Sequence, residues 1–203
     1  MNPAALSELQ LDALREISSI GASHAATALS ELVSRTIRIS VPAIEVISVT
    51  EIASVFGGPE QIVGAVFAPL TGEIEGGVLF MVSPEGIQSI AQLLGAGPIP
   101  VEDLAKAKTA GVLVEAVRTL IDSYLQAVSE MTGLEAGASG VSWAYDMAGA
   151  LFDAMAAETG MRADHAVLVR TAFLDTDRSV DAAFFFVPDP DSLAAILDRL
   201  GLL

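Results

Sequence analysis

The sequence contains no cysteine and only two histidines, His24 and His165, among its 203 residues. The absence of cysteine excludes disulfides and thiolate-ligated zinc sites. The two imidazoles lie far apart in the sequence, and neither has further ligands at metal-binding spacing. We therefore expect no metal site and no cofactor in this chain.

Basic residues are scarce, because ten Lys and Arg stand against 26 Asp and Glu, which gives a net charge of -16 at pH 7. Clustered basic residues bind nucleic-acid backbones, so nucleic-acid binding is not expected. Only two of the basic residues are lysines, Lys106 and Lys108. Two explanations of this acidic composition are open. The source could be halophilic, because a salt-rich cytoplasm screens the self-repulsion of an acidic surface. Alternatively, the genome could be GC-rich, which favours Ala, Gly, Val and Arg.

Long apolar runs are also missing. No uninterrupted apolar stretch reaches the roughly 18 to 20 residues that a membrane-spanning helix needs, although 52% of the residues are hydrophobic. Met1 to Leu11 contains Glu8 and no basic segment of the kind that opens a secretory signal. We expect a cytoplasmic protein without membrane insertion, folded as a single domain over residues 1–203.

Two long amphipathic helices are predicted. The first follows Ser7, which forms a capping box with Gln10, and ends near Arg35. The second begins near Glu102 and stops at Gly133. Apolar residues recur at steps of three and four in both helices: Leu14, Ile17, Gly21, Ala25, Ala28 and Leu32 in the first, and Leu113, Val117, Leu120, Tyr124, Ala127 and Met131 in the second.

These helices, which an offset of 99 residues aligns, open two similar halves. The halves also end alike, because Gly76–Gly95 and Asp181–Gly201 each predict a strand, a Pro turn and a short helix. In the opening helices Glu16 aligns with Glu115 and Ser30 with Ser129, and in the closing segments Pro84 aligns with Pro190.

Further strand-like runs lie between the opening helix and the closing strand of each half. They are Ile37–Val41, Ile44–Val49, Ile62–Phe67 and Ala166–Phe173, and Thr71–Gly76 predicts a hairpin turn. The pattern predicts an α+β fold, in which a helix/antiparallel-strand/helix module is duplicated with pseudo-twofold symmetry and the long helices pack on a β-sheet. The half-repeats are residues 1–97 and 101–203, joined at Gly95–Pro100. Because duplication often replaces a homodimer, a monomer is favoured.

The first helix has a polar face opposite its apolar stripe. This face carries, at spacings i, i+4, i+7 and i+11, Asp12, Glu16, Ser19 and Ser23. A carboxylate and a hydroxyl three residues apart lie roughly 5 to 6 Å apart at Cβ, so both can contact one water molecule. Such a face is most often simply solvated, and Arg15 and Glu31 are expected to be ordinary surface charges. His24 lies among small residues and is expected to be buried or half-buried with its hydrogen bonds satisfied.

Three segments carry a resemblance to a known family. LREISSIGASHAATALSEL, SYLQAVSEMTG and YDMAGALFD resemble the CheC, CheX and FliY family of chemotaxis phosphatases, and the similarity extends over essentially the whole chain. Members of that family hydrolyse the aspartyl phosphate of the response regulator CheY. Their signature is Asp/Ser-x-x-x-Glu-x-x-Asn with a later Pro. The Glu and Asn enter the regulator's active site, where the Asn positions the attacking water.

The resemblance implies a first site at Asp12, Glu16 and Ser19, with Pro42 as the later proline. Ser19 stands where the family has Asn. The regulator's own Mg²⁺ and lysine do much of the charge neutralisation, so the phosphatase mainly aligns a water molecule. A hydroxyl reaches less far than a carboxamide, which can donate and accept at once in a fixed orientation. We therefore expect weak activity at this site.

The corresponding second site falls on Gly111, Glu115, Arg118 and Val141, and retains only the glutamate. Arg118 can attract phosphate, but it cannot accept a proton from water, and its bulk crowds the approach. No hydrolysis is expected there.

A second partner is also implied by the resemblance. The family uses the helix that contains DMAGA to bind the receptor deamidase CheD, and the aspartate of that segment is Asp146 here. An aspartate before an apolar helical run is also a suitable N-cap, and both roles can coexist.

The leading hypothesis is a chemotaxis signalling protein of the CheC type, which binds phosphorylated CheY and hydrolyses its aspartyl phosphate slowly. The alternative is a catalytically weak or inactive adaptor that binds CheD or sequesters CheY. A third hypothesis, an unrelated structural or metabolic domain, is motivated only by the acidic, apolar composition.

Removal of salt separates the two explanations of the acidic composition. If the chain is adapted to high salt, desalting is expected to abolish the far-UV circular dichroism of the folded state, because the unscreened carboxylates repel one another. A spectrum that is unchanged at low salt would favour the GC-rich genome.

Overall fold

The computed structural model describes residues 6–34, 36–95, 97–100, 103–104, 107–159, 165–175 and 178–203. Its elements follow in the order α1 (Glu8–Val33), β1 (Arg38–Ser48), the 3-10 helix η2 (Val49–Phe56), β2 (Ile62–Gly72), β3 (Gly76–Val82), α2 (Pro84–Leu93), α3 (Ala107–Thr132), β4 (Ala136–Ala138), β5 (Ser142–Met147), α4 (Ala148–Thr159), β6 (His165–Asp175), β7 (Arg178–Pro188) and α5 (Pro190–Arg199). No helix in these ranges is both long enough and apolar enough to cross a membrane.

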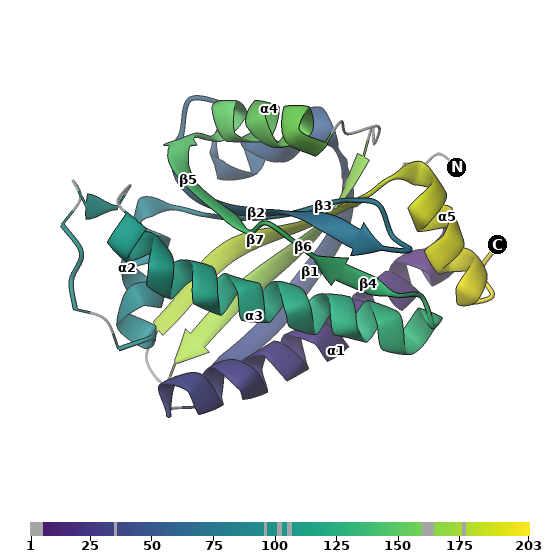
Figure 1. Ribbon diagram of the computed structural model, residues 1–203, viewed down its shortest axis with the longest axis horizontal. Coiled ribbons are helices and arrows are strands. Elements are labelled where there is room, and N and C mark those ends of the chain that lie inside the picture. The colour runs from purple at the N-terminus through teal and green to yellow at the C-terminus, as the bar shows by residue number, and fades with distance from the viewer. Residues whose placement is uncertain are drawn as a thin grey trace.

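The strands form one seven-stranded antiparallel sheet. Their order is β1-β6-β7-β3-β2-β4, and β5 also pairs with β2. Helices cover both faces of the sheet: α1 and α3 lie side by side on one face, and α4 lies on the other (Figure 1). The predicted α+β fold, with long helices packed on an antiparallel sheet, is confirmed.

The sheet separates two apolar cores, because successive side chains of a strand point to opposite faces. In β3, Val78, Phe80 and Val82 pack in the core beneath α1 and α3. Leu79 and Met81 pack in the second core, with residues of η2 and α4. All five side chains are at most 1% exposed, so the high apolar content of the sequence fills two cores and not one.

The ends of the long helices agree with the sequence in most respects. Ser7 and Gln10 form the predicted capping box, with the Gln10 side chain accepting a 2.8 Å hydrogen bond from the Ser7 N–H. The first helix ends at Val33, as its pattern predicts. The second begins at Ala107, and the predicted start at Glu102 lies outside the described residues. Gly133 follows its last residue at a φ of 70°, the left-handed conformation that ends helices.

The predicted apolar stripes are mostly buried. In α1 the exceptions are Leu32, which is 56% exposed, and the half-buried Ala28. The apolar stripe predicted from spacing alone therefore extends one helical turn beyond the part of α1 that the described elements bury. Leu29, which the prediction omitted, is 1% exposed and belongs to the core. In α3 the predicted stripe is buried except for the half-buried Met131.

The strand predictions are wrong in three places, and one of these is the short strand β4, which was not predicted. The runs Ile37–Val41 and Ile44–Val49 form one strand, β1, whose register with β6 shifts between Ser40 and Ala43. Pro42 lies within this shift, where its missing N–H does not interrupt a regular ladder. Strand β5 was not predicted, although the alternation of Trp143 and Tyr145 with smaller residues is a signal for it.

The order of the strands is compatible with the predicted duplication. The strands can be matched in pairs, β1 with β5, β2 with β6 and β3 with β7. When the members of each pair are exchanged, the order β1-β6-β7-β3-β2-β5 becomes the same order read in reverse. At the centre, Leu79 of β3 pairs directly with Phe185 of β7. These two residues are 106 positions apart, which is also the spacing between Pro84 and Pro190. A pseudo-twofold axis through this pair would relate the two halves.

Matched hydrogen bonds join each long helix to the strand that follows it. Ser30 Oγ accepts a 2.8 Å hydrogen bond from the N–H of Ile37, and Ser129 Oγ accepts a 3.1 Å hydrogen bond from the N–H of Ala136. Both members of the second pair lie 99 residues after those of the first. The aligned serines therefore have the same structural role in both halves.

The crossing of α1 and α3 depends on Gly21. A Cβ atom added to Gly21 would lie 2.8 Å from the Cα of Tyr124, so the two helices meet there without a side chain between them. Gly21→Ala adds about 1 kcal/mol of helix propensity, whereas overpacking against a backbone costs about 1 to 3 kcal/mol. We expect a net destabilisation of up to about 2 kcal/mol in urea unfolding.

Gly111→Ala is the matched control, because an added Cβ at this exposed α3 position meets nothing within 4 Å. This variant should be stabilised by up to about 1 kcal/mol. Equal stabilisation by both substitutions would contradict the close crossing.

Candidate functional site

The polar face of α1 is exposed, as the sequence predicts. We call Asp12, Glu16, Ser19 and Ser23 the α1 ridge, and all four residues are exposed. The residues that α1 buries, such as Leu14 and Ile17, lie on its opposite side. The carboxylate of Glu16 is therefore accessible to another protein.

Two contacts organise the α1 ridge. Ser19 Oγ donates a 2.9 Å hydrogen bond to the backbone carbonyl of Arg15. This bond uses the hydroxyl proton and leaves the oxygen lone pairs as acceptors. The Arg15 guanidinium forms an ion pair with Asp12. Arg15, which was expected to be an ordinary surface charge, therefore contacts the α1 ridge through its backbone carbonyl and through its side chain.

The equivalent face of α3 carries a different set of groups. We call Gly111, Glu115, Arg118 and Asp122 the α3 ridge, and all four residues are exposed. Arg118 Nε lies 3.7 Å from Asp122 Oδ2. At the position where α1 has a hydroxyl, α3 therefore has a cation whose carboxylate partner lies one turn further along.

The two ridges are separate surfaces. Helices α1 and α3 run in opposite directions across the same face of the sheet (Figure 1). Glu16 precedes Gly21 and Glu115 precedes Tyr124, so the two glutamates lie on opposite sides of the crossing. With a rise of 1.5 Å per residue, they are about 20 Å apart along the helix axes. The structure does not bring the two predicted sites together.

The later positions of the two motifs belong to the scaffold. Pro42 lies in β1 at its register shift with β6, and its side chain is outside the described residues. Val141 is half-buried and packs against the core beneath α1 and α3. Neither position adds a polar group to a ridge.

Asp146 is exposed and lies on β5, one residue before the end of the strand. Its Oδ1 accepts a 2.8 Å hydrogen bond from the N–H of Met147. The predicted N-cap role is wrong, because α4 begins at Ala148 and its first two N–H groups donate to the carbonyls of Gln61 and Pro59. The turn before β2 thus occupies the helix start, and the Asp146 carboxylate stays at the surface.

An exposed apolar pair accompanies Asp146. Met147 pairs with Ile62 of the neighbouring strand β2, and these side chains are 43% and 42% exposed. Because successive side chains of a strand point to opposite faces, this apolar pair and the Asp146 carboxylate lie on opposite faces of the sheet. Val63, which pairs with Asp146, packs in the second core, on the side of α4.

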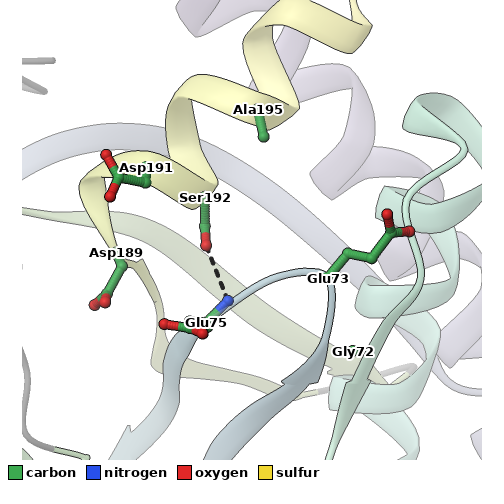
Figure 2. A pocket seen from close by; sticks show the side chains of 7 residues that line it. All are labelled: Gly72, Glu73, Glu75, Asp189, Asp191, Ser192 and Ala195. Carbon is green, nitrogen blue, oxygen red and sulfur yellow. Dashed lines mark hydrogen bonds between the residues drawn. The ribbon is translucent and has the colours of Figure 1, made fainter.

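A hollow lies between the β2–β3 turn and the start of α5, and its lining includes Glu73, Glu75, Asp189 and Asp191. Figure 2 shows Glu73 pointing away from the other three carboxylates, and its Oε2 accepts a 2.8 Å hydrogen bond from the N–H of Glu135. Ser192 Oγ accepts a 2.9 Å hydrogen bond from the N–H of Glu75 (Figure 2). The carboxylates do not converge, and the described residues contain no His, Cys, Asp and Glu cluster able to hold a metal ion.

Two polar side chains lie behind the ridges, the buried Tyr124 and the half-buried His24. Burial raises the pKa of the Tyr124 phenol well above its ordinary value, and the neighbouring Ser18 hydroxyl opposes this shift.

His24 is half-buried as predicted, but its Nδ1 has no hydrogen-bond partner among the described residues. The expectation of a satisfied histidine is therefore wrong, since its alanine and serine neighbours do not supply a partner to this nitrogen.

The site is thus a pair of exposed helical ridges, which suits a protein that acts on other proteins. Residues 9–46 match the CheC-like family. The CheY-P phosphatase CheC of Bacillus subtilis (strain 168) is 31% identical over 200 residues, which cover 97% of this chain and 96% of that protein. The chain belongs to the CheC-like family.

Solved structures agree with this fold at low sequence identity. The crystal structure of Thermotoga maritima FliY matches with a TM-score of 0.78 at 18% identity, over 97% of this chain and 98% of that one. The FliM–SpeE complex of H. pylori contains a chain that matches with a TM-score of 0.70 at 13% identity, over 98% and 99% of the two chains. At these identities the likeness concerns the fold alone.

Proposed function

We propose that this protein is a chemotaxis phosphatase, which docks its α1 ridge on a phosphorylated CheY-type response regulator and hydrolyses the aspartyl phosphate. The observation that carries the proposal is the exposed pair of Glu16 and Ser19 on one face of α1. Similarity over 97% of the chain to a protein named CheY-P phosphatase supports the same assignment. The expected location is the cytoplasm, where such regulators act.

In the proposed reaction, a water oxygen forms a bond to phosphorus while the bond between phosphorus and the aspartyl oxygen breaks. The products are inorganic phosphate and the free aspartate, and the water proton passes to phosphate or solvent. The Mg²⁺ ion belongs to the regulator and neutralises developing charge there. The contribution of this chain is to place the water in line with the breaking bond.

Ser19 is suited to one part of that task. Its proton is held by the Arg15 carbonyl, so its outward lone pairs accept a hydrogen bond from the attacking water. Glu16, one turn away on the same face, enters the regulator's site beside it. Because the short hydroxyl holds the water at only one point, we expect the reaction to be slow.

The α3 ridge has a different role in this proposal. Arg118 there cannot orient an attacking water as an acceptor, so Glu115 and Arg118 form a site without hydrolysis. An adaptor that sequesters the regulator or binds CheD is therefore the second candidate function. The exposed carboxylate of Asp146 is the observation that favours a CheD surface at the end of β5.

Substitutions on the α1 ridge test the phosphatase. Glu16→Gln is expected to slow the dephosphorylation of CheY-P at least about tenfold, because the neutral amide loses charge-assisted contacts to the regulator. Ser19→Asn is expected to raise the rate, by up to about 100-fold if a misplaced water is the limitation. The measurement is the decay of phosphorylated CheY at high salt.

Glu31→Gln is the control, because Glu31 is exposed on the same helix but lies outside the α1 ridge. Its rate should equal that of the wild type. Failure of every variant, including Ser19→Asn, to accelerate decay above the regulator's own rate would remove the phosphatase and leave the adaptor.

A charge reversal tests the CheD surface. Asp146→Lys is expected to lower capture of CheD in a pull-down by about tenfold or more, because a lysine opposes contacts made to a carboxylate. Asp198→Lys makes the same charge change at an exposed position on α5 and should bind like the wild type. Equal capture by all three proteins would exclude Asp146 from the interface.

A further inference from the structure

Arg15 is the one Lys or Arg in the sequence of α1, and it borders the α1 ridge on the side of Ser19. Each residue of a helix turns about 100° around the axis, so Arg15 and Glu16 lie on either side of the line from Asp12 to Ser19. Ser19 also donates its hydroxyl proton to the Arg15 carbonyl. Arg15 and Glu16 thus occupy the helix positions on either side of Ser19, whose hydroxyl is proposed to hold the water.

The ion pair with Asp12 determines where this guanidinium lies. Asp12 is one turn nearer the start of α1 than Arg15, so the pair draws the cation away from Ser19. Both side chains are largely open to solvent, with 48% and 61% of their surfaces exposed. Exposed ion pairs of this kind are weak. The pair uses Nη1 of Arg15, and a guanidinium has five N–H donors, so the remaining donors can bind a further, stronger anion while Asp12 stays in place.

A phosphoryl group is such an anion, because it is doubly charged and the planar guanidinium can bind two of its oxygens at once. We propose that Arg15 recognises the phosphoryl group of the docked regulator, and that Asp12 is a positioning residue that keeps the guanidinium clear of Ser19. This inference rests on the proposed function. It assigns selectivity for the phosphorylated regulator to a residue outside the Asp12, Glu16 and Ser19 set.

The α3 ridge provides an internal comparison. Arg118 occupies the position that corresponds to Ser19, and its partner Asp122 lies beyond it, not before it. There the cation lies where the water would be held, whereas on α1 the ion pair lies before the glutamate and leaves the hydroxyl open. The position of the arginine relative to the glutamate therefore distinguishes a hydrolytic ridge from one that only binds.

The test measures binding and not turnover, with a CheY-type regulator in Mg²⁺ alone and in Mg²⁺ with beryllofluoride, a stable mimic of the phosphoryl group. The wild type should prefer the beryllofluoride form. Arg15→Gln is expected to reduce that preference by about tenfold or more, the effect of losing a charged hydrogen bond, with little change in affinity for the unmodified form. Arg15→Lys should restore part of the preference, and Arg199→Gln, at an exposed position on α5, should leave it unchanged.

Asp12→Asn tests the positioning role. Freed from its partner, the guanidinium should still bind the mimic as in the wild type or more tightly, while kcat for dephosphorylation falls. A fall in binding and no fall in kcat would overturn this role.

The possible failures are distinguishable. If Glu16→Ala weakens binding but Arg15→Gln leaves the preference for the mimic intact, or weakens both forms equally, the inference about Arg15 is wrong and the proposed function stands. If neither the wild type nor any variant binds either form of the regulator, both are overturned.

Discussion

The pairing of β3 with β7 is the contact on which the rest of the structure depends. It joins the last strand of each half at the middle of the sheet, with Leu79 directly opposite Phe185. The side chains that the structure describes in both strands are buried on both faces, so neither half can leave the sheet without exposing two cores. This pairing holds the two long helices on the same face, where α1 and α3 must pack against each other.

The packing of these helices turns their polar faces outward. Because Gly21 has no side chain, α1 and α3 approach backbone to backbone, and their apolar stripes are buried together on the sheet. The ridges that remain at the surface lie at aligned positions of the two helices but differ in chemistry. On α1 a carboxylate and a hydroxyl are open beside a paired arginine, whereas on α3 the arginine replaces the hydroxyl. A scaffold with matched halves therefore presents two unequal faces.

Much of this was predictable from local pattern. The apolar period of both long helices, the capping box at Ser7 and the hairpin at Thr71–Gly76 all follow from contacts between residues close in sequence. Predictions failed where distant residues decide the outcome. Asp146 is not an N-cap because the carbonyls of Gln61 and Pro59, from the turn before β2, occupy the start of α4.

The sequence by itself determined which residues form the polar face of α1, because a helical period places Asp12, Glu16 and Ser19 on one side whatever the rest of the chain does. It also determined that the two halves differ at Ser19 and Arg118. Only the tertiary structure decided that both faces are solvent-exposed and separate, that Asp12 is paired with Arg15, and that the Ser19 proton is already used. The exposure of a helix face depends on which other elements pack against the helix. The hydrogen-bond or ion-pair partner of a hydroxyl or guanidinium depends on the groups around it in space. The spacing of residues in the sequence specifies neither.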